Sequence, residues 1–163
     1  MSADFISETD KQMKRSGQKN MLRTVNVKEV TAAIKEMCIE ANHFLSDDMA
    51  ARMKKAVDEE ESPLGKQILT QLQENLQIAG DDMIPICQDT GMAVVFIKVG
   101  QEVHFEGGSL TDAINQGVHD GYVDGFLRKS VVKDPIFREN TKDNTPAIIH
   151  YFLNVRRNTY VYN

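Results

Sequence analysis

Cys87 is the residue in this sequence whose type and setting most directly suggest chemistry. It follows Pro85-Ile86 and begins a polar segment, Cys87-Gln88-Asp89-Thr90-Gly91, which we expect to be a loop between a helix and a buried strand. A thiolate in such a loop could ligate a metal ion or an iron–sulfur cluster, with the neighbouring polar groups facing a ligand. The alternative is an inert thiol in a turn, because no CxxC partner accompanies it.

Asp89 also belongs to the tripeptide Asp-Thr-Gly, the signature of aspartic proteases, in which two such aspartates share a proton. The sequence contains one copy, so this mechanism would require a homodimer. The helix-rich first half of the chain and the polar Gln88 argue against a protease. Asp-Thr-Gly is also a good turn sequence in its own right.

Arg128 ends a predicted helix together with Lys129, where cations complement the helix dipole. Arg128 could instead clamp a substrate carboxylate through its two-pronged guanidinium group. The second cysteine, Cys38, lies in an apolar helical stripe and is expected to pack in the core. No histidines pair at metal-ligand spacing, so each is expected to be solvated or structurally hydrogen-bonded. The histidines are His43, His104, His119 and His150.

The composition is that of an ordinary globular protein of 163 residues, with 41% hydrophobic and 26% charged residues. Nineteen Lys and Arg against 24 Asp and Glu give a net charge of −5, which lacks the basic field of a nucleic-acid or anionic-membrane binder. The longest apolar run, Met92 to Ile97, is far shorter than the ~20 residues that span a bilayer. Residues 1–20 are polar and match neither a secretory signal nor an organelle transit peptide. We therefore expect a cytoplasmic protein with free thiols.

Three amphipathic helices are expected to come first among the elements that position these residues. Apolar residues at helical spacing run from Val27 to Leu45, with Asn26 or Thr24 as the cap. Ser46 is expected to cap the second helix, and Ser62-Pro63 to open the third, which would stop at Gly80. The predicted inner faces of these two helices comprise Met49, Met53, Ala56 and Val57, and Leu64, Ile68, Leu72, Leu76 and Ala79.

Strands and one long helix are expected to follow. Residues 93–99 are typical of a buried strand, and a turn at 100–101 leads to a short partner strand, 102–105. Ser109 is expected to cap a helix that runs to about Leu127. Its predicted apolar face comprises Leu110, Ile114, Val118, Tyr122 and Phe126, beside a stripe formed by Gly117, Gly121 and Gly125.

The glycine stripe indicates close backbone packing, because each glycine destabilises a helix by ~1 kcal/mol relative to alanine. The polar loop at 140–145 is turn chemistry by default, although it could also line a polar pocket; a strand over 147–155 follows it. The predicted class is therefore α+β, with amino-terminal helices packed with a small mixed sheet and a long glycine-striped helix.

Six segments in collinear order resemble a known family. They are CIEAN at 38–42, ESPLGK at 61–66, PICQDTGMAVVF at 85–96, GGSLTDAIN at 107–115, LRKSVVKDP at 127–135 and DNTPAIIHY at 143–151. They are similar to the amino-terminal domain, or alpha subunit, of class I (iron–sulfur) fumarate hydratases and of the related L-tartrate dehydratases. PICQDTG is the most specific of them. The predicted organisation is a polar extension at 1–22, a partial fumarase-like domain at 23–155 and an atypical tail at 156–163.

The resemblance implies a hydro-lyase that adds water reversibly across a carbon–carbon double bond, with a [4Fe-4S] cluster as the Lewis acid. Cys87 would be the first cluster ligand. Gln88 and Asp89 would contact the bound dicarboxylate, and Arg128 would grip one of its carboxylates. The resemblance covers both fumarate and tartrate as substrates.

Departures from the family pattern limit what this chain is expected to do alone. Lys142 replaces a glycine usual in the family, and two further cluster cysteines and the catalytic base belong to stretches that this chain does not contain. We therefore expect a truncated alpha-type subunit or fragment, inactive alone, that oligomerises and needs a carboxy-terminal domain or beta subunit. The alternatives are a non-catalytic binding or assembly module that keeps the fold and, less favoured, a homodimeric aspartic protease acting through Asp89.

Overall fold

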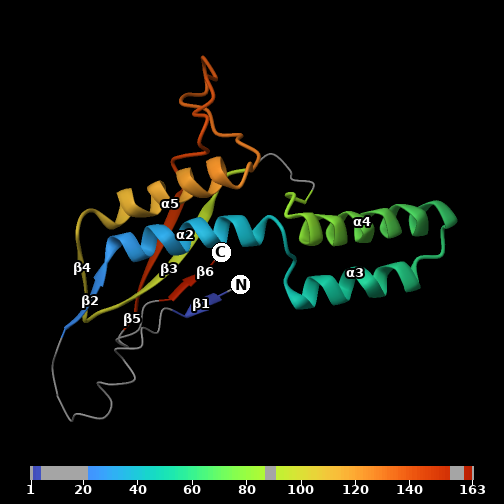
Figure 1. Ribbon diagram of the computed structural model, residues 1–163, viewed down its shortest axis with the longest axis horizontal. Coiled ribbons are helices and arrows are strands. Elements are labelled where there is room, and N and C mark those ends of the chain that lie inside the picture. Colours follow the sequence, from blue (N-terminus) through green and yellow to red (C-terminus); the bar gives the residue numbers. More distant parts are fainter. Residues whose placement is uncertain (1, 5–21, 87–90, 155–159, 163) are drawn as a thin grey trace, which may run out of the picture.

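Two helices, α2 (Val27–Ala41) and α5 (Leu110–Asp124), lie side by side across one face of a small sheet in the computed structural model of the protein (Figure 1). The structure describes residues 2–4, 22–86, 91–154 and 160–162. Both helices begin as predicted. The Asn26 side chain accepts a hydrogen bond from the Lys28 N–H at 3.0 Å, and the Ser109 hydroxyl accepts one from Asp112 at 3.3 Å.

The sheet contains four strands in the order β1-β6-β3-β5. The strands are β1 (Ser2–Asp4), β6 (Tyr160–Tyr162), β3 (Val94–Gly100) and β5 (Ile148–Asn154). β3 and β5 run parallel, with Val94 opposite Ile148, whereas β6 is antiparallel to both of its neighbours. The sheet is thus mixed, and the α+β class is confirmed.

A second sheet of two parallel strands corrects the predicted hairpin. β4 (Val103–Glu106) pairs with β2 (Arg23–Asn26), directly before α2, and not with β3. The prediction joined neighbouring segments through a local turn. The observed pairing instead bridges strands about eighty residues apart in the sequence, which no local pattern reveals.

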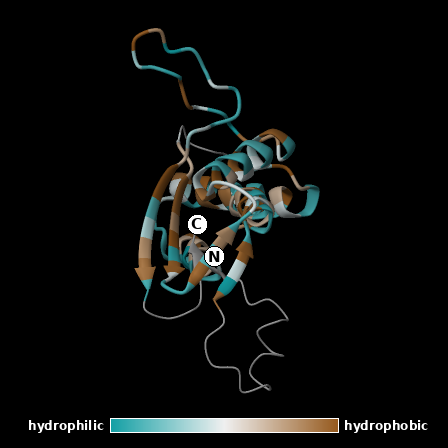
Figure 2. Ribbon diagram, turned by 90° about the vertical axis from the view of Figure 1, so that its left-hand side faces the viewer, coloured by the Kyte–Doolittle hydropathy of each residue, from teal (hydrophilic) through white to brown (hydrophobic). Residues whose placement is uncertain are grey.

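The hydrophobic core lies between the two helices and the sheet. From α2 and α5 it receives mainly aliphatic side chains, and from β3 it receives Val95 and Ile97, which alternate with Phe96 on the opposite face. Phe96 stacks on His150 of β5 with ring centroids 5.0 Å apart. The core residues are Val25, Val30, Ile34, Met37, Cys38, Val95, Ile97, Ile114, Val118 and Leu127. Figure 2 shows the hydrophobic stretches along the strands.

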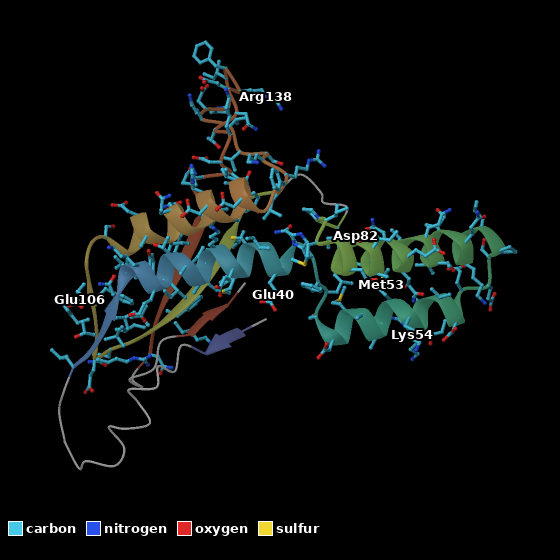
Figure 3. The ribbon with its side chains drawn as sticks, in the orientation of Figure 1. Glu40, Met53, Lys54, Asp82, Glu106 and Arg138 are labelled. Atoms are coloured by element: carbon cyan, nitrogen blue, oxygen red, sulfur yellow. The ribbon has the colours of Figure 1, made fainter. Side chains whose placement is uncertain are left out.

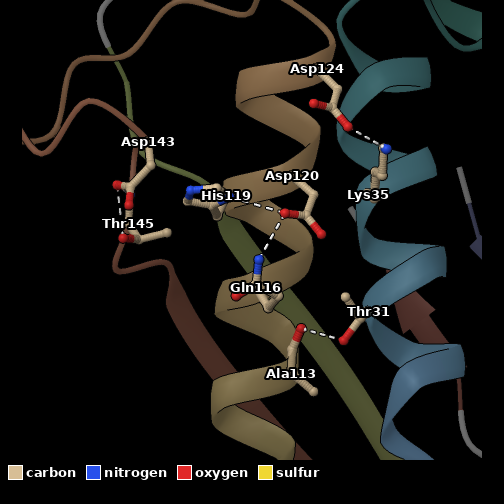
Figure 4. A network of polar contacts seen from close by, with 9 residues as sticks. All are labelled: Thr31, Lys35, Ala113, Gln116, His119, Asp120, Asp124, Asp143 and Thr145. Atoms are coloured by element: carbon tan, nitrogen blue, oxygen red, sulfur yellow. Dashed lines mark hydrogen bonds and ion pairs between the residues drawn. The ribbon is translucent and has the colours of Figure 1, made fainter.

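Close approach of α2 and α5 confirms the interpretation of the glycine stripe. A Cβ atom at Gly117 would lie 2.6 Å from the backbone oxygen of Thr31, and one at Gly121 would lie 2.8 Å from the Cβ of Cys38. The Thr31 hydroxyl donates across the helix pair to the carbonyl of Ala113 at 3.0 Å (Figure 4). An ion pair between Lys35 of α2 and Asp124 of α5, at 2.5 Å, is a further polar contact between the two helices.

Helices α3 (Asp47–Glu59) and α4 (Pro63–Asp82) form an arm that extends away from the sheet (Figure 1). Their predicted inner faces are only partly covered, since they pack on each other and not on the core. Met53 lies on the side of α3 that faces α4, and Lys54 lies on the other side (Figure 3). Leu64, Ile68 and Leu72 remain 43–66% exposed. Amphipathic periodicity predicted these helices correctly but did not predict what they pack against.

The predicted ends of α4 and α5 need correction. The α4 cap is as predicted, since the Ser62 hydroxyl accepts from the Gly65 N–H at 3.3 Å, but the helix passes Gly80 and ends where Met83 turns left-handed, with φ 51°. α5 ends before Gly125, so Phe126 adopts φ 54° and is 86% exposed instead of completing the apolar face. A left-handed conformation costs a non-glycine residue about 1–2 kcal/mol.

Candidate functional site

Cys87, Gln88 and Asp89 lie outside the described residues, so the structure places their flanks and not their side chains. Before them, the Ile86 N–H donates to the carbonyl of Asn42 at 2.8 Å. After them, the carbonyl of Ala93 accepts from the Ile148 N–H at 2.9 Å as β3 and β5 begin. The predicted loop therefore joins the base of the helical arm to the amino-terminal end of β3.

Arg128 follows the end of α5 and is exposed, while its neighbour Leu127 is only 2% exposed and lies in the core. The residues that follow Arg128 are hydrogen-bonded to the loop at 140–144. The Thr141 N–H donates to the carbonyl of Val131 at 2.9 Å, and the Asn140 amide donates to the carbonyl of Lys129 at 3.0 Å. The backbone on either side of Arg128 is thus anchored.

Asn144 is the residue that connects these segments, and it is completely buried. Its side-chain oxygen accepts from the backbone N–H groups of Ser130, at 2.7 Å, and Val131, at 3.0 Å. Its side-chain nitrogen donates to the carbonyl of Gly91 at 3.4 Å. One side chain therefore ties the segment after Arg128 to the residue that ends the CQDTG motif.

Sequence reasoning missed Asn144, because it treated the loop at 140–145 as turn chemistry by default. Asn144 has φ 63°, a left-handed conformation that asparagine tolerates better than most residues. The Tyr122 hydroxyl is also hydrogen-bonded to the Asn144 side chain, and burial raises the pKa of that tyrosine. The signal in the sequence was an Asn-Thr-Pro turn following Asp143, within one of the motifs that carry the resemblance.

The other polar residues near this loop support it. Asp143 accepts hydrogen bonds from both the backbone N–H and the hydroxyl of Thr145 at 2.9 Å (Figure 4). Burial opposes ionisation of Asp143, but these bonds outweigh it, and the pKa of the carboxyl lies below its ordinary value. His119 of α5, whose charge also acts on Asp143, bonds to Asp120 at 3.0 Å. Away from this loop, just after α2, the buried His43 contacts the carbonyl of Ile39 at 2.6 Å.

No three His, Cys, Asp or Glu side chains within the described ranges lie together as a metal site. Cys38 is 6% exposed in the contact between α2 and α5, as predicted, and burial raises the pKa of its thiol to about 11. Iron–sulfur clusters are held mainly by thiolates, so Cys38 does not fit as a cluster ligand. Because the sequence has two cysteines, the residues of this chain do not fit a complete [4Fe-4S] cluster.

The Cys38 thiol should make the stability of the protein pH-dependent in the alkaline range. The folded state holds the proton more tightly than the unfolded chain, so the contribution is complete below pH 9.0 and is lost as the pH rises through about 11. We expect the free energy of unfolding of the wild type to fall by on the order of 1–3 kcal/mol more than that of Cys38→Ala over this range. Urea unfolding at successive pH values measures the difference; parallel pH profiles of the two proteins would contradict it.

Comparisons with known proteins show the family of the chain. The family model described as Fumarate hydratase (Fumerase) matches residues 31–161. A provisionally assigned L(+)-tartrate dehydratase subunit alpha of Methanocaldococcus jannaschii is 32% identical over 128 residues, 78% of this chain and 44% of that protein. The L(+)-tartrate dehydratase subunit alpha of Escherichia coli K12 is 37% identical over 62% of this chain and 33% of its own length. The anaerobic class I fumarate hydratase of the same strain is 35% identical over 58% and 18%.

The chain belongs to the fumarate hydratase family. This family and the relatives just described indicate an enzyme of the hydro-lyase type. It spans less than half the length of each of these relatives. In the part of the chain that the structure describes, no helix combines the length and apolar character needed to cross a bilayer.

Proposed function

We propose that this chain is the dicarboxylate-binding part of an alpha-type hydro-lyase subunit, which acts in the hydration of fumarate to malate or the dehydration of tartrate. The family match over residues 31–161 is the observation that carries the proposal. In it, Arg128 binds a substrate carboxylate, Gln88 and Asp89 contact the same dicarboxylate, and Cys87 supplies one thiolate to an iron–sulfur cluster. Arg128 suits this role because it is exposed while its flanking backbone is anchored.

A complete enzyme needs groups from outside these residues. Cys87 is the single candidate ligand of this chain, so the remaining thiolates and the catalytic base would come from a carboxy-terminal domain or a beta-type subunit. Anaerobic iron–sulfur reconstitution followed by fumarate-hydration and tartrate-dehydration assays is expected to give no turnover from this polypeptide alone. A stoichiometric cluster with turnover from the isolated chain would contradict this division of labour.

Arg128→Ala is expected to weaken dicarboxylate binding by the isolated chain at least about tenfold, because a charge-assisted bidentate contact contributes roughly 1.5–3 kcal/mol. The dicarboxylate affinity of Arg128→Lys should lie between those of the wild type and Arg128→Ala, since lysine keeps the positive charge but cannot make the bidentate contact. Wild-type affinity without the cluster is expected to be on the order of 1 mM. The measurement is a nuclear magnetic resonance titration with fumarate, L-malate and L-tartrate.

Acetate serves as the monocarboxylate control for this titration, and Arg138→Ala as the matched variant. Arg138 is an exposed arginine in the segment between α5 and β5, which projects away from the helices (Figure 3). Its replacement should leave dicarboxylate binding unchanged. If the wild type binds acetate as well as it binds fumarate, the site does not select a dicarboxylate. If Arg128→Ala binds fumarate like the wild type, Arg128 is not the carboxylate-binding residue.

A further inference from the structure

One loop, residues 140–144, binds the backbone that follows Arg128 at several points. The Lys129 carbonyl, the Ser130 and Val131 N–H groups and the Val131 carbonyl all bond to residues 140–144. Of the described contacts of this loop, the Asn144 bond to Gly91 at 3.4 Å reaches the CQDTG segment. Asn144 therefore connects the backbone after Arg128 directly to Gly91, the residue that ends the CQDTG segment.

We propose that Asn144 is a positioning residue for dicarboxylate binding, which holds the backbone after Arg128 against Gly91, the residue that ends the CQDTG segment. This inference rests on the proposed function, because it takes these two segments as the ones that bind the substrate. Asn144 itself touches no substrate in the proposal. It acts through Ser130 and Val131 on one side and through Gly91 on the other.

The chemistry of the amide explains why asparagine stands at this position. An amide group carries an acceptor and a donor on one rigid planar unit, so it can accept from Ser130 and Val131 while donating to Gly91. A carboxylate of the same size would keep the first two bonds but would turn an oxygen toward the Gly91 carbonyl. Complete burial makes that mismatch costly, because two acceptors would face each other away from bulk solvent.

Asn115 gives the matched comparison, because it makes the same two kinds of bond elsewhere. Its side-chain oxygen accepts from the Ala147 N–H at 2.9 Å, and its nitrogen donates to the Thr111 carbonyl at 3.0 Å. It thereby fixes the start of β5 against α5. Asn115→Asp removes a donor in the same way as Asn144→Asp, but no bond to Gly91, Ser130 or Val131 is lost.

The test compares the wild type, Asn144→Asp, Asn144→Gly and Asn115→Asp as full chains labelled with nitrogen-15. The amide nitrogen of Met92 reports on the hydrogen bond to the Gly91 carbonyl, and hydrogen exchange reports on the Ser130 and Val131 N–H groups. Fumarate is the titrated probe. Asn144→Gly keeps the left-handed backbone accessible and takes the place of Asn144→Asp if that variant does not fold.

We expect Asn144→Asp to shift the Met92 signal, to leave Ser130 and Val131 protected and to weaken fumarate binding about tenfold. Asn144→Gly should lose the protection as well and bind more weakly still. Asn115→Asp should bind fumarate within about twofold of the wild type, although it too loses stability. A purely structural role would lower the fraction of folded protein but would leave the affinity read from the signals of the folded state unchanged.

Two results would overturn the inference: fumarate binding by Asn144→Asp within about twofold of the wild type, or equal weakening in Asn115→Asp. If the wild type binds no dicarboxylate, the proposed function fails separately. The link between the segments is then judged by the amide signals alone. Unchanged Met92, Ser130 and Val131 signals in both Asn144 variants would refute it.

Discussion

Gly117→Val is expected to lower the free energy of unfolding by roughly 3–5 kcal/mol, with Gly117→Ala at about 1–3 kcal/mol. The first added carbon would lie 2.6 Å from the backbone oxygen of Thr31 and 2.7 Å from the Cβ of Ile34. Neither atom can rotate away, so α2 and α5 must separate, and the core between them and β3 loses its packing. The intrinsic helix propensity gained on replacing glycine, ~1 kcal/mol for alanine, acts in the opposite direction and is too small to compensate.

Gly80→Val is the matched control, because Gly80 also lies inside a helix. The nearest atoms that its Cβ would meet belong to the ring of Phe44, at 3.1 and 3.6 Å, and this exposed side chain can move. Its replacement should change the free energy of unfolding by less than about 1 kcal/mol. Urea unfolding of the three variants measures these differences. Equal losses at positions 117 and 80 would mean that the helix contact is not the cause.

Local sequence patterns predicted the features that depend on neighbouring residues. Ser62 and Ser109 were recognised as caps, and Asn26 as one of two candidates, because capping involves a side chain and an N–H two or three residues away. The spacing of Gly117 and Gly121 indicated a close helix contact before any partner was known. Each signal is a pattern of residues that lie no more than about four positions apart in the sequence.

Long-range partners are the part that the sequence did not reveal. Nothing near Val103 indicates that its strand pairs with Arg23, or that the apolar stripe from Leu64 to Leu72 stays largely uncovered by this chain. Helical periodicity also placed Phe126 in the core, whereas α5 ends two residues earlier and turns it outward. A period gives the face of an element, but tertiary packing decides where the element ends and what covers that face.

The candidate site follows the same division. Arg128 was singled out as a cation at the end of a predicted helix, and the family resemblance favoured its binding role over a purely structural one. Its exposure and anchored backbone are compatible with that role. Asn144 was not singled out, because its importance comes from contacts with Gly91 and Ser130, which are 53 and 14 residues away in the sequence. Burial of a polar side chain is visible only in the fold.

Asn144→Leu is expected to lower the free energy of unfolding by roughly 3–5 kcal/mol, although leucine has a similar size. It leaves the Ser130 and Val131 N–H groups without an acceptor at a fully buried position, and it places a branched side chain at φ 63°. Asn26→Leu is the control and should lose only ~1 kcal/mol, because its side chain accepts one bond, from the exposed Lys28 N–H. Urea unfolding measures both. Equal losses in the free energy of unfolding would mean that the buried bonds of Asn144 do not organise the loop. A buried acceptor of two hydrogen bonds would then contribute no more stability than an exposed helix cap.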